Sequence, residues 1–176
     1  MTDSRPSDDR RPCSLEEIIE REGQIAYPNV GDSMWPLIRQ GKDLVIITRK
    51  PQGRLKRYDV PLYRRDSDRQ ANNGKYVLHR ILHVRKNDYL ITGDNRWNIE
   101  RGITDRHVVG VLTAVVRCGA DPRVSNPRTV RVTDPLYRIY AHLWCDLLPL
   151  RAIIFWLRDL PGRVKRFAKL LIFASV

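Results

Sequence analysis

The alternation of apolar and polar residues predicts a mainly β domain over residues 14–118. A strand shows apolar residues at every second position or a short β-branched run, and turn residues bound it. Six segments fit this description and are separated by polar stretches containing Gly, Asn and Asp. The predicted strands are Gln24–Tyr27, Asp43–Thr48, Tyr58–Arg64, Lys75–Val84, Tyr89–Thr92 and His107–Arg117. Because the last segment is apolar almost throughout, we expect it to be buried on both faces.

A short helix is predicted before the first strand. Ser14 and Glu17 have the spacing of a capping box, and apolar residues recur at helical spacing over Leu15–Glu22. Gly23 follows as the expected C-terminal cap.

The remaining segments divide the chain into regions. Residues 1–13 are polar without periodicity, which predicts a disordered lead-in. Residues 119–134 contain Gly, Asp-Pro and Asn-Pro, which predicts a linker, with Thr129–Val132 as a candidate short strand inside it. Residues 135–176 have a helical pattern, interrupted by prolines. The sequence therefore predicts a compact β domain that carries a helical C-terminal extension.

The net charge, the placement of aromatic residues and the cysteine spacing indicate which partners and sites to expect. A formal net charge of +12 attracts anions such as nucleic acid, anionic lipid or acidic polypeptide. Aromatic residues are not interleaved with the basic runs, so no specific nucleic-acid binding is expected. The three cysteines, Cys13, Cys118 and Cys145, form no Cys-x-x-Cys motif, so we expect neither a metal site nor a disulfide framework, and no cofactor.

The N-terminal residues carry charges and lack an apolar core, so no secretory signal is expected. Together with the cysteine usage, which favours a reducing compartment, this predicts a protein that is cytoplasmic or peripheral to a membrane.

One short stretch has the features of a nucleophile turn. In Val30–Ile38, Gly31 and Asp32 precede Ser33, and Met34-Trp35-Pro36 follows. Glycine tolerates unusual backbone angles, and proline stiffens the exit of the turn. A serine held rigidly there has the placement that a nucleophile needs, if a base and an oxyanion donor meet it. The same residues also fit an ordinary loop.

His79 is the candidate base, in the predicted strand Lys75–Val84. Alternation places Val77, His79, Ile81 and His83 on one face. Arg80 then faces the other way, at the surface or at a sheet edge. A strand histidine fits both a structural role and a catalytic one.

The order of several short motifs resembles the type I signal peptidase family, within the class that includes the LexA-type self-cleaving repressors. The motifs are Gly31–Pro36, Gly41–Val45, Tyr58–Val60, His79-Arg80, Gly93-Asp94-Asn95 and Val108–Val111. The resemblance as a whole covers roughly residues 24–117. Two departures stand out: Lys42 is inserted in the second motif, and Tyr58 replaces a glycine in the third. The resemblance implies a signal-peptidase or LexA-like β fold.

The resemblance also implies that Ser33 is the nucleophile and His79 the general base, as in the endoplasmic-reticulum-like members. Histidine ordinarily titrates near pH 6.5, whereas a lysine base must have its pKa lowered by several units to be neutral at pH 7. A Ser–His enzyme is therefore expected to gain activity as the pH rises through roughly 6–7.

A third residue is expected to orient the base. Asp94 is the first choice by motif, with Glu100 and Asp105 as alternatives, and Asp94 equally fits an Asx cap that closes a turn.

The resemblance also implies a substrate-binding groove beside Ser33 and His79. Many bacterial members carry an oxyanion-stabilising hydroxyl where this chain has Gly31, so the hole is expected to use the Ser33 amide and neighbouring backbone. Met34 and Trp35 are expected either to line the groove or to pack in the core. A substrate peptide is expected to bind as an added strand.

The C-terminal region suggests a second surface. Leu136–Leu160 and Val164–Phe173 mix apolar and aromatic residues with arginine and lysine. Such segments suit the plane of an anionic membrane, and they equally fit helices that fold onto the β domain or a partner. Deleting residues 136–176 is expected to abolish vesicle binding if the first alternative holds. The uncharged runs are too short for a spanning helix.

The sequence thus favours a serine endopeptidase that cleaves an extended, leader-like or signal-like peptide of a precursor protein. The alternative is a non-catalytic peptide-binding or membrane-associated module whose basic surface meets an acidic partner. A self-cleaving regulator is a third reading, and the lack of a helix-turn-helix before the domain speaks against it.

Overall fold

The computed structural model describes residues 13–67, 75–117, 127–147 and 153. The expectations for residues 1–12 and for most of 148–176 lie outside this part. The chain divides into two compact units, Met1–Asp134 and Pro135–Val176. Each unit is described by itself.

The first unit begins with the predicted helix, α1 (Leu15–Glu22). Its capping box is confirmed: the Glu17 amide donates to Ser14 Oγ at 3.2 Å, and the Ser14 amide donates to Glu17 Oε2 at 3.1 Å. Gly23 ends the helix in the left-handed region, with φ 79°. Ile19 is the buried residue of the apolar face.

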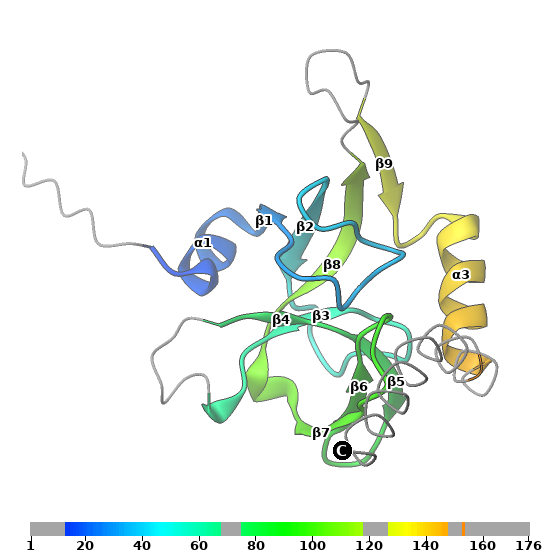
Figure 1. Cartoon of the computed structure of the whole chain (residues 1–176). Helices are drawn as coiled ribbons and strands as arrows, with labels where there is room; N and C mark the ends of the chain where they lie inside the picture. The colour runs from blue at the N-terminus through cyan, green and yellow to red at the C-terminus, as the bar shows by residue number, and fades with distance from the viewer. Residues whose placement is uncertain (1–12, 68–74, 118–126, 148–152, 154–176) are drawn as a thin grey trace, which may run out of the picture. The chain divides into compact units, whose positions relative to one another are not determined.

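The larger sheet is antiparallel and is built around one long strand, β8. Its strands are β1 (Gln24–Pro28), β2 (Asp43–Arg49), β3 (Pro61–Tyr63), β4 (Val77–Leu78), β8 (Val108–Arg117) and β9 (Arg128–Arg131). The order is β1-β2-β8-β3-β4, and β9 also pairs with β8 (Figure 1). Every residue of β8 is buried or partly buried, which agrees with the prediction from its apolar run.

A second, three-stranded sheet packs with the first around a shared core. It contains β5 (Arg80–Val84), β6 (Tyr89–Thr92) and β7 (Glu100–Ile103) in that order. The core brings Tyr63 and Val111 of the larger sheet together with Ile81, Ile91 and Ile103 of the smaller one. The mainly β fold with a helical C-terminal element is therefore confirmed, although β7 was not predicted.

The predicted strand Lys75–Val84 is two strands that belong to different sheets. β4 pairs with β3, whereas β5 pairs with β6, and His79 lies at the break between them. Alternation applies only within one sheet, so the predicted faces do not hold. Arg80, expected at the surface or a sheet edge, is fully buried.

The boundary after the β domain also differs from the prediction. Within the predicted linker 119–134, β9 pairs with β8, and the first unit extends to Asp134. The second unit starts with a helix as predicted, α3 (Pro135–Asp146). No helix in the described part of the chain has the length and apolar character needed to cross a membrane.

Candidate active site

Ser33 lies in a turn that follows β1. The Asn29 side chain donates to the Gly31 carbonyl at 3.0 Å, and Gly31 has a φ of 95°, which favours glycine. The Trp35 amide donates to the Asp32 carbonyl at 3.0 Å. Met34 is fully buried and anchors the turn in the core.

The turn at residues 93–96 holds the Ser33 backbone in place. The Asn95 amide donates to the Ser33 carbonyl at 2.7 Å, and its side chain donates to the Asp32 carbonyl at 3.2 Å. Arg96 adds an ion pair to Asp32, with 2.5 Å between Nη2 and Oδ1. The motif Gly93-Asp94-Asn95 therefore has a clear structural task beside the candidate nucleophile.

His79 is nearly buried, and one ring nitrogen faces a carboxylate. Nδ1 lies 3.0 Å from Glu100 Oε1 and 3.2 Å from the Tyr63 hydroxyl. A carboxylate can only accept, so Nδ1 carries the proton in this contact and Nε2 of the neutral ring is left as an acceptor. Burial and the nearby Glu100 charge raise the pKa of Tyr63, so its hydroxyl remains protonated.

Glu100 is ionised at neutral pH. Burial alone would raise its pKa, but the contact with His79 and the hydrogen bonds from Arg65 lower it to about 2. The Arg65 guanidinium donates to both carboxylate oxygens, at 2.9 Å from Nε and 2.7 Å from Nη2. Glu100 thus presents a fixed negative charge to His79.

The second ring nitrogen of His79 points toward the Ser33 turn. A Cβ built on Gly93 would lie 3.1 Å from His79 Nε2 and 2.6 Å from the Ser33 carbonyl oxygen. These two atoms are therefore no farther apart than the sum of those distances. An alanine at Gly93 would collide with the Ser33 backbone, so the close approach requires glycine.

Ser33 and His79 line the same pocket, which has a volume of about 320 Å³. Neither the Ser33 hydroxyl nor its amide forms a hydrogen bond with any residue that the structure describes. The hydrogen bond between a catalytic serine and its histidine is often long without substrate and tightens when substrate binds. Of the predicted groove residues, Gly31 lines this pocket. Met34 is buried in the core instead, and Trp35, which is half-exposed, is not among the lining residues described.

Asp94, the first choice for orienting the base, is occupied elsewhere. It is fully buried, and Arg80 donates to both its oxygens, at 2.9 Å from Nε and 2.8 Å from Nη2. Arg80 also donates to the Tyr58 carbonyl at 3.2 Å. The ion pair joins the start of β5 to the turn at residues 93–96. The position beside His79 Nδ1 belongs to Glu100, which the sequence offered only as an alternative.

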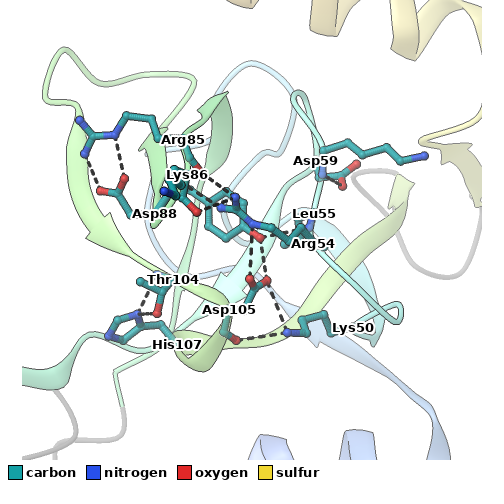
Figure 2. Close-up of polar contacts among 12 residues, drawn as sticks. Lys50, Arg54, Leu55, Asp59, Arg85, Lys86, Asp88, Thr104, Asp105 and His107 are labelled. Carbon is teal, nitrogen blue, oxygen red and sulfur yellow. Dashed lines mark hydrogen bonds and ion pairs between the residues drawn. The ribbon is translucent and has the colours of Figure 1, made fainter.

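Asp105, the other alternative, lies in a separate cluster (Figure 2). Its carboxylate accepts from the Tyr89 hydroxyl at 2.6 Å, with Lys50 at 3.5 Å and Arg54 at 3.7 Å. Arg54 in turn donates to the carbonyls of Arg85 and Lys86 at the β5–β6 turn. Asp105 therefore fastens the loop after β2 to the smaller sheet.

Tyr58 has a backbone conformation that favours glycine. It stands where the resemblance expects glycine, and its φ is 77°, in the left-handed region. Its carbonyl accepts from the buried Arg80, and its ring packs under the Arg57 guanidinium at 4.8 Å. The fold keeps a glycine-like conformation although the residue is a tyrosine.

The arrangement is suited to proton transfer from a hydroxyl. An ionised Glu100 fixes one nitrogen of His79, and the other nitrogen faces the turn that carries Ser33. Among the described residues, no group of three or more His, Cys, Asp or Glu could hold a metal ion. Comparisons with protein-family models, curated proteins and solved structures found no match for the chain.

Proposed function

We propose that this protein is a serine endopeptidase of the signal-peptidase type, acting on an extended leader-like or signal-like peptide. Ser33 is the nucleophile, His79 the general base and Glu100 the residue that orients the base. The main support for the proposal is the position of His79. Its ring lies between the Glu100 carboxylate and the Ser33 turn, and Ser33 and His79 line the same pocket.

The reaction follows from these roles. His79 Nε2 takes the Ser33 proton as Oγ attacks the scissile carbonyl carbon, and it then gives that proton to the leaving amine. The acyl–Ser33 ester forms and the amine departs. A water molecule, deprotonated by His79, attacks the ester, and the carboxylic product leaves with Ser33 restored. Glu100 stabilises the imidazolium that forms in each half of the reaction.

The oxyanion is stabilised by few donors. The Ser33 amide forms no hydrogen bond with the described residues and is available to a developing oxyanion. Gly31 supplies no hydroxyl. Since loss of one donor costs about 3 kcal/mol of transition-state stabilisation, we propose that acylation is slow compared with members that carry the hydroxyl.

A peptide can reach the pocket as an additional strand. β4 is the last strand in the order of the larger sheet, and Val77 and Leu78 of β4 line the pocket. Val30 and Gly31 line it from the Ser33 turn, and Val30 is 77% exposed. An extended peptide between these segments can pair with the edge of β4 that no other described strand occupies.

Covalent trapping tests the proposal. The full chain is incubated with an alkyl fluorophosphonate and with a peptide mixture of extended, alanine-rich sequences, and intact mass and cleavage products are measured. We expect an adduct on Ser33 and cleavage, both absent in Ser33→Ala and reduced at least about 100-fold in His79→Ala. His83→Ala, at an exposed position of β5, is the matched control and should behave as the unmodified protein.

Two results would contradict the proposal. Cleavage that persists in Ser33→Ala would exclude the mechanism. Peptide binding without either adduct or cleavage would favour the non-catalytic peptide-binding module.

A further inference from the structure

The pocket beside Ser33 is lined by an excess of cationic side chains. Arg65, Lys75 and Arg96 line it, whereas Asp32 is the one acidic side chain among the described lining residues. The whole chain carries a formal net charge of +12, which adds a positive field to this local excess. An anionic ligand group is therefore favoured over a cationic one in this pocket.

Arg96 approaches the point where Ser33 and His79 come together. Its Cγ lies 3.0 Å from the position of a Gly93 Cβ, the same point that His79 Nε2 and the Ser33 carbonyl approach. Its alkyl chain therefore passes directly beside both candidate catalytic residues. The guanidinium at the end of this chain pairs with Asp32, which lines the same pocket as Ser33.

The ion pair between Arg96 and Asp32 is exposed on both sides. Its partner Asp32 is 58% exposed and Arg96 itself 49% exposed. Exposed ion pairs contribute at most about 1 kcal/mol, so an incoming carboxylate can share or replace Asp32. Arg65 differs, because its Nε and Nη2 both donate to the partly buried Glu100 carboxylate. Lys75 is exposed and lines the pocket just before β4.

We propose that this pocket selects peptides that carry a carboxylate close to the bond held at Ser33, with Arg96 as the main contact and Lys75 as a second one. The carboxylate has two sources, an acidic side chain or the C-terminus of the peptide. This inference rests on the proposed function only for the position of the scissile bond. The preference for a carboxylate concerns peptide binding and does not require that the bond be cleaved.

Binding to the full-length Ser33→Ala protein measures this selection without turnover. Three fluorescein-labelled, alanine-rich peptides of equal length are compared by anisotropy: a neutral amide, an amide with one central glutamate, and a neutral peptide with a free C-terminus. We expect one carboxylate peptide to bind about fivefold more tightly than the neutral amide at low salt, with the advantage lost at high salt. The better carboxylate peptide identifies the source.

Substitutions then locate the contact. Arg96→Gln should remove most of the fivefold advantage, and Arg96→Lys should retain part of it. Arg101→Gln is the matched control, because it removes the same charge from an exposed position of β7 outside the lining residues described. Circular dichroism confirms that each variant is folded.

The outcomes separate the two proposals. Equal binding of the three peptides, an equal loss in Arg96→Gln and Arg101→Gln, or no binding of any peptide would overturn the inference. If carboxylate-selective binding depends on Arg96 but the unmodified protein gives neither adduct nor cleavage, the inference stands and the peptidase proposal fails.

Discussion

Two acidic side chains near His79 have similar partners and different surroundings. Asp94 and Arg80 form a fully buried pair, in which neither side chain is exposed. Glu100 and Arg65 form a partly buried pair, with side chains 21% and 33% exposed, and Glu100 also contacts His79. Removing one partner of a buried pair leaves an uncompensated charge, whereas a partly exposed arginine can regain water. The two carboxylates should therefore affect different properties.

Neutral substitutions of the two acids separate these roles. We expect Asp94→Asn to lower the free energy of unfolding by about 3–5 kcal/mol, because Arg80 loses its buried counter-charge. Glu100→Gln should change stability by roughly 1 kcal/mol and lower the rate of Ser33 labelling about 100-fold or more, because the imidazolium loses its negative neighbour. Urea unfolding and phosphonate labelling measure the two effects. A labelling rate unchanged in Glu100→Gln would remove this residue from the mechanism.

The sequence identified some residues of the site and missed others. Ser33 and His79 stand out by motif, and the structure brings them to one pocket. Glu100 could not be chosen over Asp94, because its position depends on β7, a four-residue strand that contains Gly102 and has little strand signal. The burial of Arg80 could not be predicted for a related reason. The chain passes from one sheet to the other at His79, so the alternation expected of a single strand does not apply to Arg80.

At the scale of elements, strong local signals were reliable. The capping box of α1, the β-branched run of β2 and the apolar run of β8 all gave the observed elements. β9 overlaps the candidate strand Thr129–Val132, but the sequence placed that strand in a linker, because its residues are mostly polar and join the sheet only by pairing with β8.

The helix α3 presents an apolar stripe. Leu136, Ile139 and Leu143 recur at helical spacing, and Leu147 follows directly after the helix; each is more than 40% exposed. Tyr140 and Trp144 stack beside them, with ring centroids 5.4 Å apart. Residues 135–176 carry seven Lys and Arg against two Asp. An apolar stripe with aromatic residues in a basic segment complements the surface of an anionic bilayer, and we propose that it binds there.

Vesicle co-sedimentation tests this proposal. We expect the protein to bind vesicles that contain phosphatidylserine and to bind pure phosphatidylcholine weakly. The double variant Leu136→Ser/Leu143→Ser should lose about tenfold or more in binding, because two apolar side chains no longer enter the interface. Val84→Ser/Ile99→Ser, at exposed positions of the first unit, is the control. Equal loss in both double variants, or none in either, would argue against α3 as the contact.

At the scale of the whole molecule, carboxylates paired with arginine connect stability to pH. Hydrogen bonds from Arg85 and from the Gly102 amide lower the pKa of Asp88 to about 2, and Glu100 also has a pKa of about 2. Burial alone would raise the pKa of Asp43, but contacts with Arg39 and Arg117 hold it below its ordinary value. In a chain with a net charge of +12, protonating these groups also removes negative charge that offsets the repulsion among cations.

The sign of each pKa shift predicts the pH range of stability. Groups with a lowered pKa stabilise the folded state above the ordinary carboxylate pKa of about 4, and this stabilisation is lost as the pH falls toward 2. Asp59 opposes them in part, because burial raises its pKa. On the alkaline side, burial and the hydrogen bond to Glu16 raise the pKa of Tyr76 to about 12. Stability is therefore lost as the pH rises from about 10, where tyrosine ionises in the unfolded chain, through 12.

We accordingly expect the urea midpoint to be flat between about pH 5 and 9 and to fall on both sides of that range. Glu100→Gln should reduce the acidic fall, since glutamine does not titrate. Tyr76→Phe should reduce the alkaline fall, to which Tyr63 and Tyr89 with their raised pKa also contribute, and should leave the acidic one unchanged. Each variant thus serves as the control for the other. If Glu100→Gln had the same midpoint change between pH 5 and 2.5 as the unmodified protein, Glu100 would not be held ionised by Arg65 and His79. The negative charge assigned to the orienting residue would then be wrong.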